Sequence, residues 1–453
     1  MKLLEFIKKN FRYIFLFIFF FLALHFFYAH MSGDQIYNYG FSYAMSRGEI
    51  LYKDFNLLIP PVGPIVYLLP FLFGTSFIVF NAYQAILICV LFHFLFKLFD
   101  NKAWFFLIVF VFPIPIPYIT ALFQGYNFLL ILELVILLWL EKEKKNDYLI
   151  GVILGLCVFT KQTVGVAFCL VSIFYLFKDY KKVVKRFLGF LIPCFVFLFY
   201  FLITGTLYSF FDMCLFGMFD FTSGNSGVYK IISDFYFWVF LLQFGYLIFR
   251  IIKNHRDIRN YYILAFSLVS IPLFDYNHVA YFSFVFLFLF IDAFNFRRKS
   301  IRFNICLFSC LFSVVWCYFV NGKSFPNLVK LDNFGYIVMY DNNYKEIKML
   351  VDYFDKHDNT IILSENSYVV KVAADRDIDY FDLLNKGNHG YNGTEKVIKK
   401  FVEYDDTFII LNIEAYNKFN LRQQINKKVM KYVIDNYEKV GELDERYYIY
   451  YKE

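Results

Sequence analysis

The stretch that decides the fold lies near the start of the chain: YIFLFIFFFLALHFFYA at 13–29, then MSGDQIYNY at 31–39. The first part is a nearly uninterrupted apolar run, longer than the core of a signal peptide and followed by no small-residue cleavage site. The residues before it are basic, which predicts a retained first membrane span that begins in the cytoplasm. The polar second part then places Asp34 just beyond the membrane.

Composition predicts the same class over the rest of the chain. Hydrophobic residues make up 59% of the 453 positions, and charged residues make up 18%. Repeated apolar runs approach the length needed to cross a hydrocarbon core of roughly 30 Å. We therefore expect a polytopic α-helical membrane protein with about 11 transmembrane helices. After the first span, the others are expected near 76–98, 103–121, 126–140, 148–160, 164–177, 187–205, 234–252, 261–274, 279–296 and 303–320.

The distribution of basic residues predicts the orientation of these spans. Alternate loops contain 22 Lys and Arg residues, at 1–12, 97–102, 141–147, 178–186, 250–259 and 297–302. The opposite loops within the first 320 residues contain only Arg47, Lys53, Lys161 and Lys230. Because cytoplasmic loops are enriched in Lys and Arg, the basic set is expected inside a bacterial plasma membrane. An odd number of spans then places the residues after Val320 outside.

Two domains follow from this topology: a transmembrane domain at 1–320, with a first outer loop at 31–63, and an extracytoplasmic α/β domain at 321–453. The pattern of the second domain predicts helices near 344–357, 394–403 and 424–437 and strands near 360–364, 407–412 and 447–451. The segment Gly387–Gly393 is rich in glycine but has no lysine and no strand before it. A turn is expected there rather than a phosphate-binding loop.

The topology brings polar residues from distant parts of the sequence to the outer face. Charged residues at the depth of the membrane are costly unless they face a cavity or a partner, so they are candidates for function. The set contains Asp34, Asp54, Gln124, Asn127, Lys161, Gln162, Asp212, Asp220, Asp275, Asn277 and His278.

Each main candidate also has a structural interpretation. Lys161, between two short apolar runs, suits an anionic phosphate near the headgroups, but a snorkelling lysine would have the same sequence. Asp54 is either a functional acid or an acid that caps a helix or holds the loop. His278 is either a donor to a phosphate or sugar, or an interfacial structural histidine. Glu133 and His93 lie inside spans, where hydrogen bonding within the bundle is favoured over a proton path.

Three motifs in this order resemble the GT-C superfamily of membrane glycosyltransferases. The first is RGEILYKDFNLLIPPVGPIVYLLPFLFG at 47–74, in which Gly48, Tyr52, Asp54, the proline pair and Leu-Phe-Gly match a recurring pattern. The second is GVILGLCVFTKQTVGV at 151–166, and the third is the D-x-x-H of Asp275–His278. The resemblance covers about residues 1–300. It is strongest to the bacterial branch near the protein O-mannosyltransferases and lipid A aminoarabinose transferases.

The resemblance implies a catalytic cavity on the outer face and a sugar donor carried on polyprenyl phosphate. It implies that Asp34 is the base or acceptor anchor and that Lys161 lies near the carrier phosphate. Gln162, Asp275, His278 and Tyr52 are implied as substrate-binding residues. Where related loops have paired acids, Asp34 is followed by Gln35, so a two-carboxylate site must recruit Asp54 or an acid from another loop.

The chemistry is consistent with these residue types. Displacement of a phosphate at the anomeric carbon needs a base for the acceptor hydroxyl and a cation for the leaving phosphate. A single displacement inverts the anomeric configuration. A divalent metal held by Asp34 and Asp54 is an alternative to Lys161 as the source of positive charge. The cysteines show no zinc-ligand spacing, so no other cofactor is expected.

A transporter, flippase or polymerase of lipid-linked glycans is the alternative function. Such a protein would favour paired repeats and charges along the interior of the spans, whereas here the charges gather at one face. The net charge of +7 follows from the basic cytoplasmic loops, so a nucleic-acid partner is not expected. The expected partners are membrane lipids, the polyprenyl-phosphate sugar and a glycan, lipid or protein acceptor.

Overall fold

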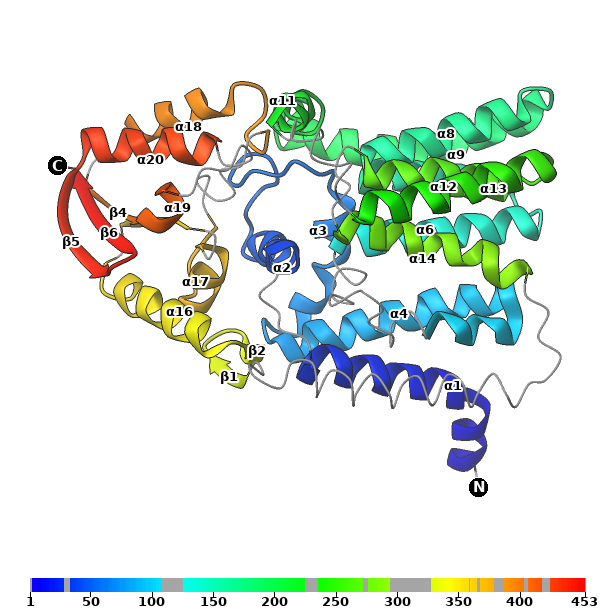
Figure 1. Cartoon of the computed structure of the whole chain (residues 1–453), viewed down its shortest axis with the longest axis horizontal. Coiled ribbons are helices and arrows are strands. Elements are labelled where there is room, and N and C mark those ends of the chain that lie inside the picture. Colours follow the sequence, from blue (N-terminus) through cyan, green and yellow to red (C-terminus); the bar gives the residue numbers. More distant parts are fainter. Residues whose placement is uncertain are drawn as a thin grey trace. The chain divides into compact units, whose positions relative to one another are not determined.

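The structure is a computed structural model of the whole chain, shown in Figure 1. It describes residues 2–27, 33–107, 125–224, 235–271, 276–293, 327–357, 359–364, 367–378, 387–402, 406–417 and 424–452. The chain divides into two compact units, each formed from several separate segments. The first unit comprises Met1–Tyr28, Ile78–Val196 and Lys230–Phe325, and the second comprises Ala29–Phe77, Phe197–Tyr229 and Pro326–Glu453.

The described elements of the first unit are all helices. Long apolar runs without internal turn signals make these helices, and most coincide with the spans expected from hydropathy. Residues 108–121 of the span expected at 103–121, and the whole span expected at 303–320, lie outside the described residues. The helices are α1 (Lys2–Leu22), η1 (Ala23–Phe27), α4 (Phe77–Phe99), η3 (Asp100–Trp104), α6 (Gly125–Lys142), α7 (Asp147–Thr160), α8 (Gln162–Leu176), α9 (Tyr180–Ile203), α12 (Phe235–Lys253), α13 (Ile258–Phe266), η7 (Ser267–Ser270) and α14 (Tyr276–Ala293).

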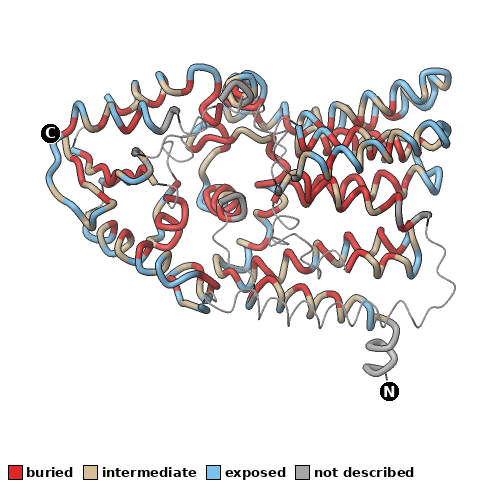
Figure 2. The backbone as a smooth tube through the Cα atoms, in the orientation of Figure 1, coloured by how far each residue is buried: buried red, intermediate tan, exposed pale blue. Residues whose placement is uncertain are grey.

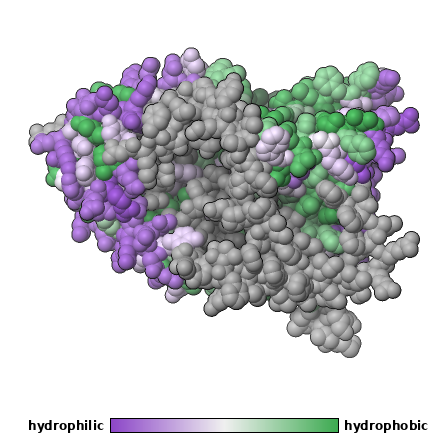
Figure 3. Space-filling view, in the orientation of Figure 1, coloured by the Kyte–Doolittle hydropathy of each residue, from purple (hydrophilic) through white to green (hydrophobic). Residues whose placement is uncertain are grey.

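The surface of this unit is suited to lipid. Phe77–Leu107 and Tyr180–Ile203 are the described helical stretches that are both long and apolar enough to cross a membrane, and several shorter helices are equally apolar. Figure 3 shows hydrophobic side chains over the visible surface of α8 and α9, where Phe174 and Phe195 are largely exposed. Figure 2 shows α6 as largely buried, and most of its buried residues are apolar.

Small residues allow close packing in the first unit. A Cβ added at Gly151 would lie 2.0 Å from the carbonyl oxygen of Arg186, and one at Gly189 would lie 2.0 Å from that of Tyr148. Each glycine therefore lets α7 and α9 approach backbone to backbone, as small residues do at membrane helix interfaces. Gly165 does the same for α8 against α7, where an added Cβ would meet Val158 at 2.3 Å.

The second unit joins the first outer loop, the segment after α9 and the C-terminal part of the chain. The sequence predicted domains at 1–320, including the first outer loop at 31–63, and at 321–453. The units of the structure group that loop and the segment after α9 with the C-terminal region. The elements are α2 (Gly33–Ser46), α3 (Val62–Val66), η2 (Leu69–Phe73), α10 (Leu207–Phe211), η5 (Asp212–Phe216), α11 (Gly217–Gly224), β1 (Asn327–Leu331), β2 (Gly335–Met339), α16 (Asp341–Phe354), β3 (Thr360–Leu363), α17 (Ser367–Ala373), α18 (Gly393–Val402), β4 (Thr407–Asn412), α19 (Ile413–Asn417), α20 (Gln424–Asn436), β5 (Glu438–Asp444) and β6 (Tyr447–Lys452).

Its four-stranded sheet has the order β3-β4-β6-β5, in which β3 and β4 are parallel and the other pairs are antiparallel. Helices α18 and α20 bury Val397, Phe401, Val429 and Val433 against one face of this sheet. The three helices and three strands predicted for this region are confirmed, as is the turn at 387–392. The hairpin β1–β2, strand β5 and the short helices α17 and α19 were not predicted.

Helix α17 connects the sheet to the first outer loop. All seven of its residues are buried, and it packs against α2. The ring of Tyr368 lies so close to Gly40 that a Cβ there would be 2.1 Å from Cδ1. The same ring makes an edge contact with Tyr37 at 5.0 Å between centroids. The C-terminal region thus supports the helix whose first turn contains Asp34.

Candidate functional site

Lys161 forms the whole connection between α7 and α8. Its extended backbone, with φ −150° and ψ 103°, ends one helix and begins the next. The half-buried side chain donates from Nζ to Oδ1 of Asn127 at 3.2 Å and lies 5.5 Å from the ring of Tyr126. Both partners are in the first turn of α6. The short outer loop predicted here is therefore a single residue that contacts the start of a third helix.

The electrostatics of this junction favour an anion. Lys161 caps the N-terminus of α8 and contacts the N-terminus of α6, and each such end carries partial positive charge and amide donors. Gln162, the first residue of α8, is half-buried beside it. One ammonium and two helix N-termini thus meet here, opposed by the partial negative charge of the α7 C-terminus, which Lys161 also caps.

A hydrogen bond between α7 and α6 lies next to the Lys161 junction. Oγ1 of Thr160 donates to Oε1 of Glu133 at 2.6 Å, and both residues are buried. His93 shares a 2.8 Å hydrogen bond between Nδ1 and the hydroxyl of Tyr13. Glu133 and His93 therefore each hydrogen bond to a neighbouring helix. This is the hydrogen bonding within the bundle that was favoured over a proton path.

The third motif is only partly described. Asp275 lies outside the described residues, whereas His278 is in the first turn of α14 and half-buried. Its ring centroid is 6.3 Å from that of Tyr281, and its carbonyl accepts from Ser270 at 3.0 Å. His278 and Lys161 both belong to the first unit, in which η7 packs against both α8 and α14.

In the second unit, Asp34 is the second residue of α2, and its side chain lies outside the described atoms. Asp54 is half-buried in the turn that follows α2. Its Oδ2 accepts from the backbone amide of Ile50 at 2.7 Å, which is the contact expected of an acid that holds its own loop. Next to it, Tyr52 has a positive φ of 65° and is buried. Its hydroxyl donates to the carbonyl of Ile59 at 2.8 Å.

The C-terminal region holds the same loop from the other side. The amide of Asn56 lies 2.9 Å from Nε2 of His389, and both side chains are fully buried. His389 is in the glycine-rich turn. The turn thus fixes the backbone two residues after Asp54, a role that the sequence did not reveal.

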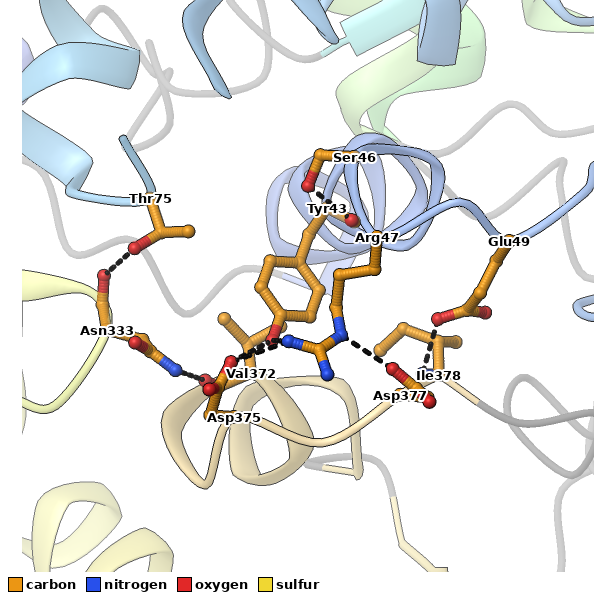
Figure 4. A network of polar contacts seen from close by, with 10 residues as sticks. All are labelled: Tyr43, Ser46, Arg47, Glu49, Thr75, Asn333, Val372, Asp375, Asp377 and Ile378. Carbon is orange, nitrogen blue, oxygen red and sulfur yellow. Dashed lines mark hydrogen bonds and ion pairs between the residues drawn. The ribbon is translucent and has the colours of Figure 1, made fainter. Parts of the chain in front are cut away.

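A second set of contacts joins the end of α2 to the loop after α17 (Figure 4). Arg47 pairs with Asp375 at 2.8 Å and with Asp377 at 2.6 Å, and the hydroxyl of Tyr43 donates to Asp375 at 2.9 Å. Both aspartates are largely exposed, so each ion pair contributes little by itself. Together they fix the position of the loop against α2.

Glu49 is the unusual acid of this network. Its Oε1 accepts from the amide of Ile378 at 3.1 Å, while Oε2 is buried without a hydrogen bond in the described structure. Burial raises the pKa of Glu49 to about 7, and the negative charges of Asp377 and Asp54 add to the rise. The Ile378 amide and the Lys371 ammonium oppose it. Glu49 lies within the first sequence motif, at 47–74, but it was not predicted as a functional residue.

Asp212 and Asp220, also predicted on the outer face, both bind the glycine-rich turn. Oδ1 of Asp212 accepts from the amide of Tyr391 at 3.2 Å, and Oδ2 pairs with Lys396. Oδ2 of Asp220 accepts from the amide of Asn392 at 3.2 Å. These acids have structural partners in the C-terminal region.

The described residues include no group of three or more His, Cys, Asp or Glu side chains placed to hold a metal. The side chain of Asp34 lies outside that set. The structure therefore brings Asp34, Tyr52 and Asp54 into the second unit, and Lys161, Gln162 and His278 into the first. Asn127 is the residue that sequence analysis placed on the outer face and that the structure pairs with Lys161.

Comparisons with known proteins agree with this architecture. A family model described as Glycosyltransferase family 87 matches residues 57–269, a range that contains Lys161 and Gln162 but begins after Asp54. The crystal structure of ArnT from Cupriavidus metallidurans bound to undecaprenyl phosphate is similar with a TM-score of 0.56. That match covers 98% of each chain at 10% sequence identity. No curated protein sequence matches the chain.

These findings confirm the predicted resemblance to the GT-C membrane glycosyltransferases. The chain shares the fold of the ArnT structure, and residues 57–269, fewer than half of its length, are similar to Glycosyltransferase family 87.

Proposed function

We propose that this protein transfers a sugar from a polyprenyl-phosphate carrier to an acceptor on the outer face of a bacterial plasma membrane. The observation that carries the proposal is the Lys161 junction, where one ammonium and the N-termini of α6 and α8 meet. Such a site suits the phosphate of a lipid-linked sugar. The similar ArnT structure is bound to undecaprenyl phosphate, which makes that carrier class the first to test.

In this mechanism, Asp34 accepts the proton of the acceptor hydroxyl while that oxygen attacks the anomeric carbon. The bond from the anomeric carbon to the phosphate oxygen breaks, and the electron pair leaves with the phosphate. Lys161 stabilises the charge that builds on that oxygen. One displacement inverts the anomeric configuration, so a retained configuration in the product would contradict the mechanism.

Other residues are given supporting roles. Gln162 and His278 lie in the first turns of α8 and α14, where their side chains would bind the donor. Asp275 is proposed to act with His278. Asp54 is proposed to shape the loop behind Asp34 through its bond to Ile50, and Tyr52 to fix that loop rather than to contact substrate.

The topology follows from the same proposal. With the N-terminus in the cytoplasm and 11 spans, the first outer loop and residues 321–453 lie outside, where a lipid-linked donor is presented after its synthesis. The sugar is a hexose or pentose, and the acceptor is a glycan, a lipid or a protein.

The decisive experiment measures release of radiolabelled sugar from polyprenyl-phosphate donors by purified protein in detergent. We expect Asp34→Asn to lower turnover by about 10²-fold or more, because general-base catalysis contributes that much. Asp341→Asn is the matched control, since Asp341 is likewise in the first turn of a helix and pairs only locally with Asn327 among its described contacts. Equal turnover in the two variants would contradict the role of Asp34.

The same preparation separates this proposal from its rival. Absence of turnover with every donor, together with movement of the carrier across proteoliposomes, would establish a transporter or flippase instead.

Metal dependence is tested by chelation. If Lys161 and the helix ends supply the positive charge, excess EDTA leaves turnover unchanged within about twofold. A complete loss that added Mg²⁺ or Mn²⁺ restores would instead establish the metal alternative, with Asp34 and Asp54 as its ligands.

A further inference from the structure

The segment after α9 has two distinct faces. Helices α10, η5 and α11 follow one another without a break from Leu207 to Gly224. One face is buried within the second unit, and Cys214 at its centre has no exposed surface. The opposite face exposes large apolar side chains, which we call the apolar stripe: Tyr208, Phe211, Leu215, Phe216 and Phe219.

The buried face packs on the first outer loop. Sγ of Cys214 lies 3.6 Å from the hydroxyl of Tyr52 and 3.8 Å from the carbonyl of Leu57. The ring of Phe210 makes an edge contact with Tyr52 at 5.5 Å between centroids. These contacts fix the rotation of the segment about its axis, so the direction in which the stripe points is determined within the unit.

The same buried side holds the C-terminal region. Asp212 pairs with Lys396 and binds the amide of Tyr391, while Asp220 binds that of Asn392. The backbones also approach closely, because a Cβ on Gly217 would lie 2.3 Å from the carbonyl oxygen of Gly387. The glycine-rich turn is therefore fixed to the side of the segment that is opposite the stripe.

The stripe is too apolar and too exposed for a surface that faces water. Tyr208 is 74% exposed and Phe219 is 70% exposed, whereas residues that alternate with the stripe, among them Phe210, Met213 and Cys214, are buried. A contiguous exposed apolar patch marks a binding surface for protein or lipid. Which of the two applies depends on what lies next to it.

Continuity with a membrane-length helix identifies the partner as lipid. The last turns of α9 belong to the same unit and expose Leu202 and Ile203, the latter at 70%. Only Thr204–Thr206 separate them from α10, and the amide of Thr206 bonds back to the carbonyl of Phe201 at 2.9 Å. Three residues span at most about 10 Å, so the stripe begins within that distance of the end of α9.

We propose that the segment Leu207–Gly224 lies in the plane of the membrane, with the apolar stripe in the boundary between headgroups and acyl chains. Its other face holds the glycine-rich turn, so the segment fixes the C-terminal region at the membrane surface. No Lys or Arg occurs from 187 to 229, so the contact depends on apolar burial rather than on anionic headgroups. The proposal does not depend on the sugar-transfer activity.

Photo-crosslinking tests this contact in the full-length protein. The aromatic photoreactive residue p-benzoylphenylalanine replaces Phe216 in one variant and Tyr208 in another, and each protein is placed in phosphatidylcholine nanodiscs. The control carries it at Tyr336, a residue of β2 that is 56% exposed and therefore similar to Phe216 in exposure. Mass spectrometry of the irradiated samples measures lipid adducts.

We expect about tenfold more lipid adduct at Phe216 and at Tyr208 than at Tyr336. We also expect the same yield when anionic lipid is added, since the stripe lacks basic residues. Yields at both positions no higher than at Tyr336, or crosslinks to protein instead of lipid, would overturn the proposal. Adducts that require anionic lipid would overturn the apolar mechanism. Because an aromatic group replaces an aromatic group, each variant is expected to elute and melt like the wild type.

Discussion

Lys161 and Arg186 lie at opposite ends of the same three helices, α6, α7 and α8. The two cations differ in their exposure and in their contacts. The side chain of Arg186 is only 7% exposed. It makes two bonds to Glu141, at 2.6 and 3.1 Å, and reaches Asp147 at 2.9 Å and Ser172 at 3.0 Å. It therefore joins α9 to the other three helices.

Lys161 is half-buried, and its contacts include a neutral amide oxygen and an aromatic ring. A cation with two carboxylate partners and little exposure acts as a cross-link between helices. A partly exposed cation at a helix junction can meet an anion that is not part of the protein. The two cations thus share a residue class and a helix bundle but differ in burial and in the contacts described for them, and this difference is the basis for proposing a structural role for Arg186 and a functional one for Lys161.

The largest expected effect comes from breaking the cross-link. Arg186→Met leaves the carboxylates of Glu141 and Asp147, 9% and 16% exposed, without their cation. Because Glu141 keeps a hydrogen bond from Tyr262, we expect a cost of up to about 3 kcal/mol, at the lower end of that for breaking a buried pair. Thermal unfolding of the purified variant in detergent measures this as a large fall in the apparent Tm. Any protein that remains folded should keep normal turnover per molecule.

Lys182→Met is the matched control on the same helix. Lys182 pairs with Asp179 at 3.1 Å, but both side chains are about half exposed, so this variant should melt like the wild type. If both variants melt alike, the buried cluster does not stabilise the bundle and the comparison fails.

The second prediction concerns the other end of the helices. Lys161→Met should lower sugar transfer by about 10²–10³-fold, because it removes a group that stabilises developing charge. Its effect on the free energy of unfolding should be smaller than that of Arg186→Met, since the hydrogen bond that it removes to Asn127 is to a neutral amide and not to a carboxylate.

Lys142→Met controls for the removal of a helix-terminal lysine. Nζ of Lys142 donates to the carbonyl of Leu98 at 2.7 Å at the opposite end of α6. This variant should retain turnover. A Lys161 variant that melts early but transfers sugar at the normal rate would reverse the assignment, making Lys161 a second structural cation.

The sequence predicted these helices and their ends for physical reasons. Long apolar runs, the polar break at Thr160–Gln162 and the basic loops are local signals, and each has a direct structural consequence. The elements of the C-terminal sheet were equally readable, because their burial pattern repeats over a few residues. Asp34 was predicted as a functional acid in the same way, because its position directly after the first apolar run can be read from neighbouring residues.

The contacts between distant segments could not be predicted in this way. Asn56 meets His389, and Arg47 meets Asp375 and Asp377, across more than 320 residues of sequence. Neither the hydrophobic periodicity nor the spacing of residues in the sequence predicts a contact between residues so far apart. The folded chain alone shows that the first outer loop is held by the C-terminal region, which is why Glu49 was not recognised as a buried acid.

The smallest expected effect is on the pH dependence of stability and concerns Glu49. One carboxylate oxygen of Glu49 accepts a hydrogen bond, and the other is buried without one in the described structure. Its pKa is raised from 4.5 to about 7 in the folded state, so the folded protein binds more protons than the unfolded chain between these values. The free energy of unfolding should therefore fall as pH rises from about 4.5 to 7, by less than about 1 kcal/mol per pH unit because the group is only partly buried.

Glu49→Gln keeps an oxygen to accept from Ile378 and removes the titration, so its apparent Tm should lose that part of the pH dependence. The exposed Glu442→Gln should leave the pH profile unchanged. Parallel profiles for the wild type and Glu49→Gln would show that Glu49 remains ionised throughout. Glu49 would then resemble Arg186, a charged group whose charge is balanced by partners within the protein.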